Sequence, residues 1–392
     1  MNPSRRQLRI LVAPNAFKES LSAMEAADAI TGGILAVLPH ARITRVPIAD
    51  GGDGTLEVVI SGTCGRIFKA KVVGPLGKKI TAEYGVTGDG KTAIIEMSRA
   101  SGLALVPPGR RNPMHTTSFG TGELMRLVLN HKVESIILGI GGSATVDGGI
   151  GALQALGAQF LDRRGRPVTF GGKGLLATSR IDLSSLDPRL RRTQLKVACD
   201  VQNPLVGPNG AAAVFGPQKG ATPIVVKLLD KGLGSLAALM CDVSGIDVSR
   251  MPGAGAAGGI SGSLHALLRA NLKPGSDLVF DLLRVKTILG KVDLVVTGEG
   301  KIDSQTPFGK GPGMLAKLAQ QRGIPVIGLA GSIGEHVECL YKEGFSAIFS
   351  IMNKPIGLDQ AIRQASFLLQ TTAAQVARLV HLGQSLQKVT IE

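Results

Sequence analysis

The stretch ADGGDGT has the composition expected of a site for a metal ion and an anion. It places Asp50 and Asp53 on either side of bare backbone at Gly51 and Gly52, with Gly54 following. Two carboxylates this close repel each other unless a cation lies between them. Because Mg²⁺ prefers oxygen ligands, both are candidate magnesium ligands, and the three glycine amides are candidate phosphate contacts. The alternative is an acidic turn that binds nothing.

A second stretch, VTGEGKIDSQTPFGKG, combines glycine with charges of both signs. Glu299 and Asp303 are further candidate ligands for the same ion, and Lys301 and Lys310 could offset phosphate charge. The apolar run at residues 292–296 predicts a strand, followed by a loop that starts at Gly298. A solvated surface loop is the alternative to a binding site.

A third glycine-rich stretch, GIGGSATVDGG at residues 139–149, follows an apolar run and precedes a helical pattern. Bare amides at Gly141 and Gly142 would suit a phosphate or a carboxylate at the start of a helix. A tight packing turn is the alternative. Asp147, within this stretch, is either a carboxylate satisfied by backbone amides or a catalytic acid–base group.

Two other loops carry candidate groups. Lys18 and Ser20 follow the first strand, where a lysine can hold a phosphate as a point charge. Asp200, in ACDVQNPL, is either a turn residue or a ligand for metal or substrate. The phosphate-loop match GVTGDGKT at residues 85–92 is interpreted as a coincidence, because a strand rather than a helix follows it and GDG fits a hairpin turn.

The elements that must position these groups alternate between strand and helix at both ends of the chain. Strands are predicted at residues 9–13 and 43–48 with a helix at 22–38 between them, and again at 292–296, 325–329 and 347–351 with a helix at 312–321. Between these ends, residues 67–97 alternate in the manner of antiparallel hairpins. A helix at 121–130 and a strand at 135–138 follow, and one long helix closes the chain.

This order predicts an α/β protein with two domains. A doubly wound parallel sheet of about five strands would be built from both termini, residues 1–64 and 291–392, and a second α/β domain with antiparallel strands would be inserted at 65–290. Ligands of open parallel sheets bind past the carboxyl ends of the strands. The loops expected there begin at Asn15, Asp50, Gly298, Gly331 and Met352.

Composition narrows the partners. The formal charge of +15 would suit nucleic acid, but the basic residues are isolated or paired and no basic run is interleaved with aromatic residues. A field that attracts small anions fits equally well. With no apolar run of 18 residues, no membrane span is expected. The four cysteines form no CxxC pair and no signal peptide is recognised, so we expect a reducing, cytoplasmic location.

Six motifs, in this order, resemble the bacterial glycerate kinases that are neither P-loop nor MOFRL-like enzymes. They are APNAFKESLSA, PIADGGDGTLE, GIGGSATVDGG, ACDVQNPLVGPNGAAAVFGPQKGA, PGAGAAGGISG and VTGEGKIDSQTPFGKGP. The resemblance covers nearly the whole chain. It implies a flavodoxin-like domain from both termini with an inserted α/β domain, and phosphorylation of D-glycerate by ATP and Mg²⁺, usually giving 2-phosphoglycerate.

Placed on these motifs, the candidate residues gain roles in a reaction expected between the two domains. Asp147 or Asp200 would accept the hydroxyl proton, and Lys219 or Arg99, with Ser20, would bind glycerate. The remaining glycines and lysines named above would bind phosphate. Phosphorylation at the 3-hydroxyl or of a related hydroxy acid is the alternative, and a dehydrogenase or a nucleic-acid binder is more distant. Association into a homo-oligomer is left open.

Overall fold

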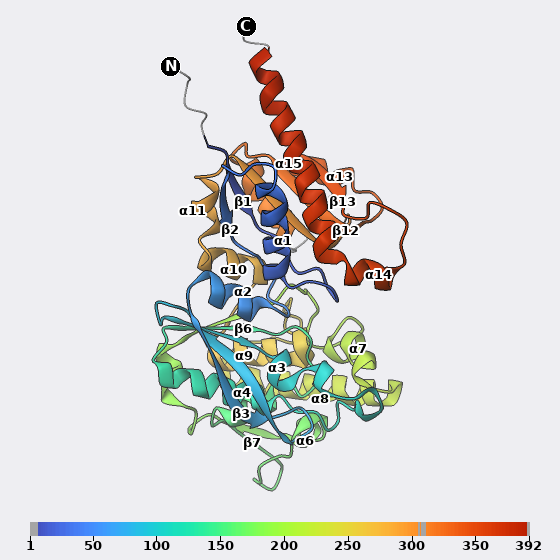
Figure 1. Ribbon diagram of the computed structural model, residues 1–392. Helices are drawn as coiled ribbons and strands as arrows, with labels where there is room; N and C mark the ends of the chain where they lie inside the picture. Colours follow the sequence, from blue (N-terminus) through green and yellow to red (C-terminus); the bar gives the residue numbers. More distant parts are fainter. Residues whose placement is uncertain (1–6, 305, 307–310, 390–392) are drawn as a thin grey trace. The chain divides into compact units, whose positions relative to one another are not determined.

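The computed structural model describes residues 7–304, 306 and 311–389, which form two compact units (Figure 1). Unit 1 comprises Met1–Asp50 and Val279–Glu392, and unit 2 comprises Gly51–Leu278. The chain passes between them at the Asp50–Gly51 bond and within helix α10 (Gly275–Leu282). The domain boundaries expected from the sequence, at residues 64/65 and 290/291, remain a prediction.

Unit 1 contains a fully parallel sheet, which confirms the fold class expected from the sequence. Its strand order is β13-β12-β11-β1-β2, and every neighbouring pair is parallel. Numbered along the sheet's own strands this is the order 2-1-3-4-5 of flavodoxin-like folds. The strands are β1 (Arg9–Val12), β2 (Arg42–Arg45), β11 (Leu294–Ile302), β12 (Val326–Ile333) and β13 (Ala347–Ser350).

Helices cover both faces of this sheet. Ile10 and Val12 of β1 pack against α1 (Ala23–Leu35) and α15 (Ala365–Val389), while Leu11 between them is equally buried on the opposite face. Such burial on both faces is why parallel strands read as continuous apolar runs. The other helices of the unit are α11 (Val285–Leu289), α12 (Gly311–Gln320), α13 (Cys339–Lys342) and α14 (Leu358–Arg363).

Two expectations about unit 1 are wrong in detail. Strand β11 does not end near Val296 but continues to Ile302, because residues 297–302 stay paired with β12, with Glu299 opposite Ala330 and Lys301 opposite Ser332. Glycine and charge indicated a loop, but the partner strand satisfies the backbone instead. The long final helix is also two helices, α14 and α15.

Unit 2 is built on a mixed sheet of order β10-β9-β6-β5-β4-β3. Strands β5, β6, β9 and β10 are parallel, whereas β3 and β4 form the expected antiparallel hairpins. Strands β7 (Gln159–Leu161) and β8 (Arg180–Asp182) form a small separate sheet. The main strands are β3 (Arg66–Val73), β4 (Lys79–Val86), β5 (Thr92–Glu96), β6 (Ser135–Gly139), β9 (Gln194–Ala198) and β10 (Asn271–Lys273).

The helices of unit 2 share an aliphatic core with this sheet, centred on residues such as Ile95, Leu138 and Val197. They are α2 (Thr55–Gly62), α3 (Ser98–Ser101), α4 (Phe119–Val128), α5 (Ile150–Ala155), α6 (Gly171–Ala177), α7 (Ala211–Phe215), α8 (Pro223–Ser244) and α9 (Ile260–Leu268). The GVTGDGKT match lies on the hairpin between β4 and β5, with Gly90 at φ +73°, so no helix follows it and its interpretation as a coincidence is confirmed.

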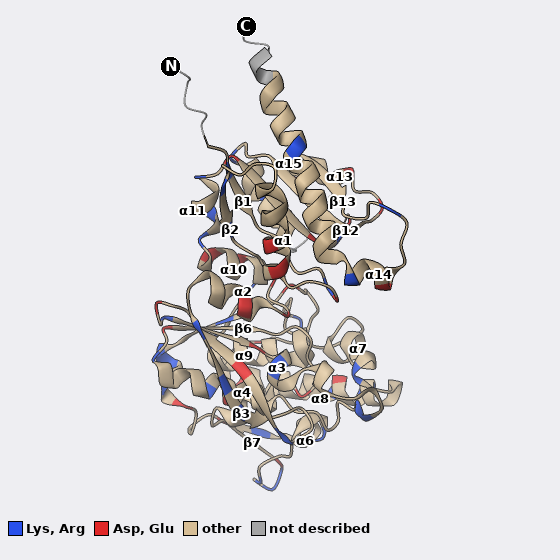
Figure 2. Ribbon diagram, viewed as in Figure 1, with Lys and Arg blue, Asp and Glu red and all other residues tan. Residues whose placement is uncertain are grey.

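Charges of both signs are interspersed over the elements of each unit (Figure 2). None of the described helices has both the length and the apolar character needed to cross a membrane.

Candidate active site

The carboxyl ends of four parallel strands in unit 2 form one aligned row. Glu96 of β5 lies opposite Gly139 of β6, Gly139 opposite Ala198 of β9, and Ala198 opposite Lys273 of β10. Open parallel sheets bind their ligands at this kind of edge. The segments that leave β6 and β9 carry two of the sequence-predicted stretches, GIGGSATVDGG and ACDVQNPL, so the fold brings these two to one edge.

The glycine turn of ADGGDGT packs directly onto this row. A Cβ added at Gly51 would lie 2.8 Å from the Cβ of Ala198, and one added at Gly139 would lie 2.6 Å from the Gly51 carbonyl oxygen. A Cβ at Gly141 would lie 3.5 Å from Gly52 Cα. Side chains at Gly51 and Gly139 would therefore push the turn away from the sheet edge. The sequence predicted the glycines as ligand contacts, which stays a prediction, and their close packing is by itself a structural reason for glycine at Gly51 and Gly139.

Two glycines of this turn provide a matched pair of substitutions. Gly51 and Gly54 both have φ +89°, but a Cβ at Gly54 would meet nothing within 4 Å. We expect Gly54→Ala to cost about 1 kcal/mol of unfolding free energy through backbone strain alone. Gly51→Ala is expected to cost about 2–4 kcal/mol, because a steric clash with Ala198 is added to the same strain. Chemical denaturation measures both. Equal costs would mean that the packing of the turn on Ala198 contributes nothing.

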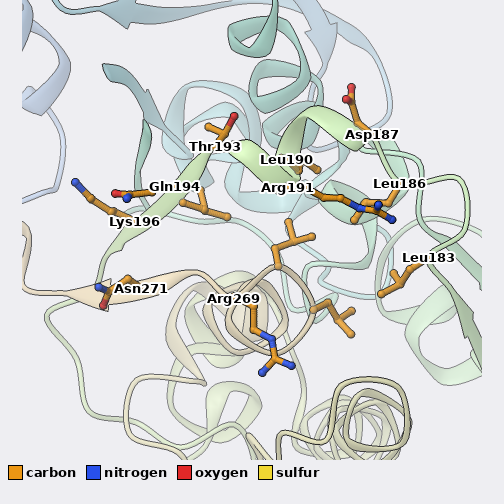
Figure 3. A pocket seen from close by; sticks show the side chains of 13 residues that line it. Leu183, Leu186, Asp187, Leu190, Arg191, Thr193, Gln194, Lys196, Arg269 and Asn271 are labelled. Carbon is orange, nitrogen blue, oxygen red and sulfur yellow. The ribbon is translucent and has the colours of Figure 1, made fainter. Parts of the chain in front are cut away.

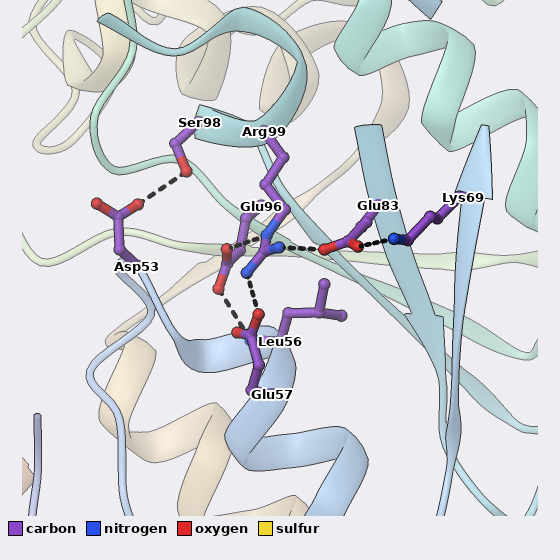
Figure 4. Close-up of polar contacts among 8 residues, drawn as sticks. All are labelled: Asp53, Leu56, Glu57, Lys69, Glu83, Glu96, Ser98 and Arg99. Carbon is purple, nitrogen blue, oxygen red and sulfur yellow. Dashed lines mark hydrogen bonds and ion pairs between the residues drawn. The ribbon is translucent and has the colours of Figure 1, made fainter. Parts of the chain in front are cut away.

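An ion-pair network fixes the helix that starts after the turn (Figure 4). Glu96 accepts a hydrogen bond from the Leu56 N–H at 2.8 Å, in the first turn of α2. Arg99 donates to Glu96 at 2.7 Å and to Glu83 at 2.5 Å, and it also pairs with Glu57. Burial raises the pKa of Glu96, while the Leu56 and Arg99 hydrogen bonds act in the opposite direction. This network ties α2 to strands β4 and β5.

Arg99 was a sequence candidate for binding a substrate carboxylate. Its guanidinium is engaged by three glutamates, from α2, β4 and the end of β5. Such an arginine is already overcompensated by negative charge, so these contacts favour a role in positioning the turn. Asp53 is likewise held in place, because Ser98 Oγ donates to Asp53 Oδ1 at 2.8 Å.

The loop after β6 offers unsatisfied donors. In the described part of the chain, the backbone N–H groups of Gly141 and Gly142 have no protein acceptor, and the buried hydroxyl of Thr55, at the end of the ADGGDGT turn, has no partner. A buried polar group such as the Thr55 hydroxyl is costly to leave unpaired, whereas the amides of the exposed Gly141 and Gly142 are open to water or a ligand. The expectation that these amides open a helix is wrong, since α5 begins only at Ile150. The Gly141 and Gly142 amides therefore belong to a loop, and the dipole of α5 does not contribute at their position.

The two carboxylates that the sequence left undecided lie in different environments. Asp147 is completely buried and accepts hydrogen bonds from the N–H and Oγ of Ser118, at 2.9 and 2.7 Å, and from the Gly149 N–H at 3.0 Å. Asp200 is exposed, two residues past the end of β9, and its Oδ1 accepts the Gly275 N–H at 3.0 Å. Asp147 therefore organises a loop, whereas Asp200 can reach a ligand.

Lys219 is a buried lysine, only 2% exposed. Its Nζ donates to Ser143 Oγ at 2.8 Å and to the Thr145 carbonyl at 2.7 Å. Burial lowers the pKa of Lys219 to about 7, although the charge of Asp147 acts to raise it. These bonds hold the loop after β6 from beneath, so a substrate carboxylate would have to displace them to reach the ammonium group.

The remaining candidates lie at the carboxyl edge of the unit 1 sheet. Thr306 links two of them: its Oγ1 donates to Glu299 at 3.2 Å and accepts the Asp303 N–H at 3.1 Å. Lys301 Nζ lies 3.2 Å from Asp303 Oδ2. A Cβ added at Gly300 would lie 3.4 Å from the backbone nitrogen of Lys18. The fold therefore brings Lys18 and the β11 extension together.

Asp50 and Ser20 border the same edge of unit 1. In the loop after β1, the Pro14 carbonyl accepts a hydrogen bond from the Ile48 N–H at 2.9 Å. The Asn15 N–H donates to the Gly298 carbonyl at 2.8 Å. The segments leading to Asp50 and Glu299 thus flank one loop. Ser20 Oγ donates to the Phe17 carbonyl within its own turn. Lys310 lies outside the described residues.

Four carboxylates were expected to supply magnesium ligands: Asp50, Asp53, Glu299 and Asp303. Across residues 7–304, 306 and 311–389, no three His, Cys, Asp or Glu side chains converge in a way that could hold a metal ion. A cage made entirely by the protein is not what these residues form. Mg²⁺ usually takes one or two carboxylates together with substrate phosphates and water, so one of these carboxylates would be enough, and its role as a ligand stays a prediction.

These features define an α/β protein with glycine-rich loops at the carboxyl edge of a parallel sheet. A sequence profile of the glycerate kinase family matches residues 10–381. A glycerate kinase of Bacillus subtilis is 47% identical, with 97% of this chain and 99% of the relative covered, and a glycerate 2-kinase of Escherichia coli is 46% identical, with 96% and 99% covered.

A solved structure agrees with both relatives. The crystal structure of a Salmonella typhimurium LT2 protein described as a glycerate kinase 2 has a TM-score of 0.90 and 46% identity, with 97% of this chain and all of that chain covered. The chain belongs to the glycerate kinase family, and it is a phosphotransferase.

Apart from Ser20, sequence reasoning did not single out the hydroxyl groups near the candidate residues. Ser98 orients Asp53, Ser143 binds Lys219, and Thr55 is buried without a partner at the start of α2. Thr55 and Ser143 lie inside the quoted glycine motifs, where a hydroxyl beside bare backbone could have indicated them. Ser98 has no such signal, because it lies at the start of helix α3 and is 45 residues away from Asp53 in the sequence.

Proposed function

We propose that this protein transfers the γ-phosphoryl group of ATP to the 2-hydroxyl of D-glycerate, giving 2-phospho-D-glycerate and ADP. Membership of the glycerate kinase family supports the substrate class, and the Escherichia coli relative is named a glycerate 2-kinase. The observation that carries the proposal is the packing of Gly51 on the aligned strand ends of unit 2, the edge that also carries Asp200 and the exposed amides of Gly141 and Gly142.

Phosphate binding falls to the glycine amides. Gly141 and Gly142 present N–H groups, and the turn at Gly51, Gly52 and Gly54 brings further backbone within reach of the same edge. Backbone amides suit phosphate because they donate without reorganising as charge develops. Lys18, Lys301 and Lys310 are proposed to offset phosphate charge.

Asp200 is the proposed general base. Proton acceptance requires a carboxylate that can approach the substrate hydroxyl, and Asp200 is exposed at the strand ends, where the Gly275 amide orients it. The oxygens of Asp147 are instead directed at Ser118 and Gly149 inside the core. Phosphoryl transfer needs mainly alignment and charge neutralisation, so a single positioned base is sufficient.

The group that binds the carboxylate of glycerate stays a prediction. Lys219 or Arg99, with Ser20, was proposed from residue chemistry. The contacts of both cations favour a positioning role, because Lys219 holds the loop after β6 and Arg99 holds α2. A glycerate KM measured for Lys219→Met separates the two roles, since a direct contact would raise KM and a positioning contact would lower kcat.

Asp50 is proposed as a Mg²⁺ ligand, with Glu299, Asp303 and Asp53 as further candidates. When bound, the ion would neutralise charge on the phosphates. Asp50 directly precedes the glycine turn, and its carboxylate is a hard oxygen donor.

Asp50→Asn keeps an oxygen donor but removes the charge. We therefore expect the Mg²⁺ concentration for half-maximal activity to rise at least about tenfold. Initial rates of ADP release at increasing Mg²⁺ measure this, with Asp28→Asn as the control because Asp28 is an exposed partner of Arg45 on α1. An unchanged Mg²⁺ dependence would remove Asp50 from the metal site.

Product identity tests the proposed function. Purified protein with ATP, Mg²⁺ and D-glycerate is expected to release ADP, and the product is expected to be converted by enolase, which accepts 2-phosphoglycerate. ADP release without an enolase substrate would indicate the 3-hydroxyl as acceptor. No glycerate-dependent ADP release would refute the proposal, and related hydroxy acids would then be assayed in the same way.

A further inference from the structure

We propose that unit 2 carries a second binding site, for a small amphipathic anion, at the amino edge of its main sheet. The structure has a cavity of about 670 Å³ there, lined by strands β9 and β10, the end of α9 and the 3₁₀ helix Pro188–Arg192 (Figure 3). This volume is within the range of small-molecule sites, about 300–1,000 Å³.

The cavity is separate from the candidate active site. Strand β9 begins at Gln194, which lines the cavity, and ends at Ala198, two residues before Asp200. Its neighbour β10 begins at Asn271, also in the lining, and runs in the same direction. The cavity and the proposed base therefore lie at opposite ends of the same two strands.

One side of the cavity is apolar. Leu195 and Leu267 are nearly buried, at 6% and 9% exposed, and they are joined in the lining by half-buried leucines. Those leucines are Leu183, Leu186, Leu190 and Leu268. Aliphatic side chains from separate elements around one hollow suit the hydrocarbon part of a ligand, since burial of that part is favourable by about 25 cal/mol per Å².

The polar part of the lining is positive. Arg191, Lys196 and Arg269 are its cations, and Figure 3 shows them around the hollow with Lys196 next to Asn271. The carboxylate of Asp187 is already bound by Arg189, whose hydrogen bonds lower the pKa of Asp187.

The cations themselves are available. Within the part of the chain that the structure describes, the side chains of Arg191 and Lys196 form no ion pair or hydrogen bond, and Arg269 donates only to the Ser244 carbonyl. Cations beside an apolar wall match a carboxylate or phosphate monoester attached to an aliphatic chain. A phosphate-rich nucleotide would leave the leucines unused.

Isothermal titration calorimetry on the full chain tests this with two probes, octanoate and octyl phosphate. We expect saturable binding to one site for at least one of them, and the better probe identifies the head group. Arg191→Gln/Lys196→Gln is expected to weaken that binding about tenfold, as the loss of two partly exposed charge pairs would. The matched control is Arg163→Gln/Arg164→Gln, which removes two exposed charges from the turn between β7 and β8.

Three results would contradict a site that combines positive charge with an apolar wall. If octan-1-ol bound as tightly as the charged probes, charge would play no part in binding. If acetate bound as tightly as octanoate, the leucines would play no part. Binding unchanged in Arg191→Gln/Lys196→Gln but lost with excess ADP would place the probe elsewhere. Each result would overturn the proposal. Since the readout is binding heat, it does not depend on the proposed kinase reaction.

Discussion

Replacing Asp200 with asparagine is expected to lower kcat by about two to four orders of magnitude, the usual contribution of a general base. Asparagine retains the oxygen that accepts the Gly275 N–H, so the local geometry should survive. What is lost is the capacity to take the hydroxyl proton. Because the side chain is exposed, the free energy of unfolding should change little.

The measurement is ADP release at saturating ATP, Mg²⁺ and D-glycerate, with the thermal midpoint recorded on the same samples. Asp182→Asn is the matched control, because Asp182 is a partly exposed carboxylate that also accepts a backbone amide, from Ser184, but lies on the separate β7–β8 sheet. A kcat within about threefold of wild type for Asp200→Asn would show that another group takes the proton.

Local pattern predicted most of the fold. Buried apolar runs such as ILV in β1 and LVV in β11 indicated parallel strands, and alternation across β3 and β4 indicated hairpins. The end of β11 was predicted wrongly because its length depends on β12, a partner that lies far away in the sequence. Strand limits set by such pairing are not encoded in the residues of one strand.

The site was predicted as motifs but not as an arrangement. Glycine and carboxylate composition indicated candidate anion-binding loops, because those residue types carry the chemistry themselves, and this binding stays a prediction. Nothing in the sequence separates the environments of Asp147 and Asp200, because burial of a carboxylate is decided by elements such as Ser118 that pack onto it. For the same reason the sequence suggests that Arg99 is a free cation, whereas the fold places three glutamates around it.

Lys219→Met is expected to change how stability depends on pH. Burial lowers the pKa of Lys219 to about 7 in the folded protein, below the ordinary value of 10.5. Between these values the unfolded chain holds a proton that the folded chain has released, so the free energy of unfolding rises with pH. The cost of burying the charged lysine is complete below pH 7 and disappears above 10.5.

Removing the lysine removes this slope. The unfolding free energy of wild type, minus that of Lys219→Met, is expected to rise by about 2 kcal/mol between about pH 7 and 9. Chemical denaturation at several pH values measures the difference, and other groups that titrate in this window cancel in it. A flat difference would mean that Lys219 keeps its ordinary pKa despite burial.

The buried carboxylate of Asp147 should contribute to stability through its charge interaction with Lys219. At about pH 6, where the lysine is still protonated, Asp147→Asn leaves the lysine charge less compensated and should cost about 3–5 kcal/mol of unfolding free energy. In the double variant Asp147→Asn/Lys219→Met neither charge is left alone. The combined loss should therefore fall short of the sum of the single losses by about 1–3 kcal/mol.

The same variants separate structure from catalysis. If Asp147 only supports the loop after β6, Asp147→Asn retains turnover at temperatures below its lowered thermal midpoint, while Asp200→Asn loses turnover at an unchanged midpoint. The reverse pattern, with Asp147→Asn stable but inactive, would assign the proton to Asp147. Stability and rate measured on both aspartates therefore decide between the two carboxylates that the sequence left as equals.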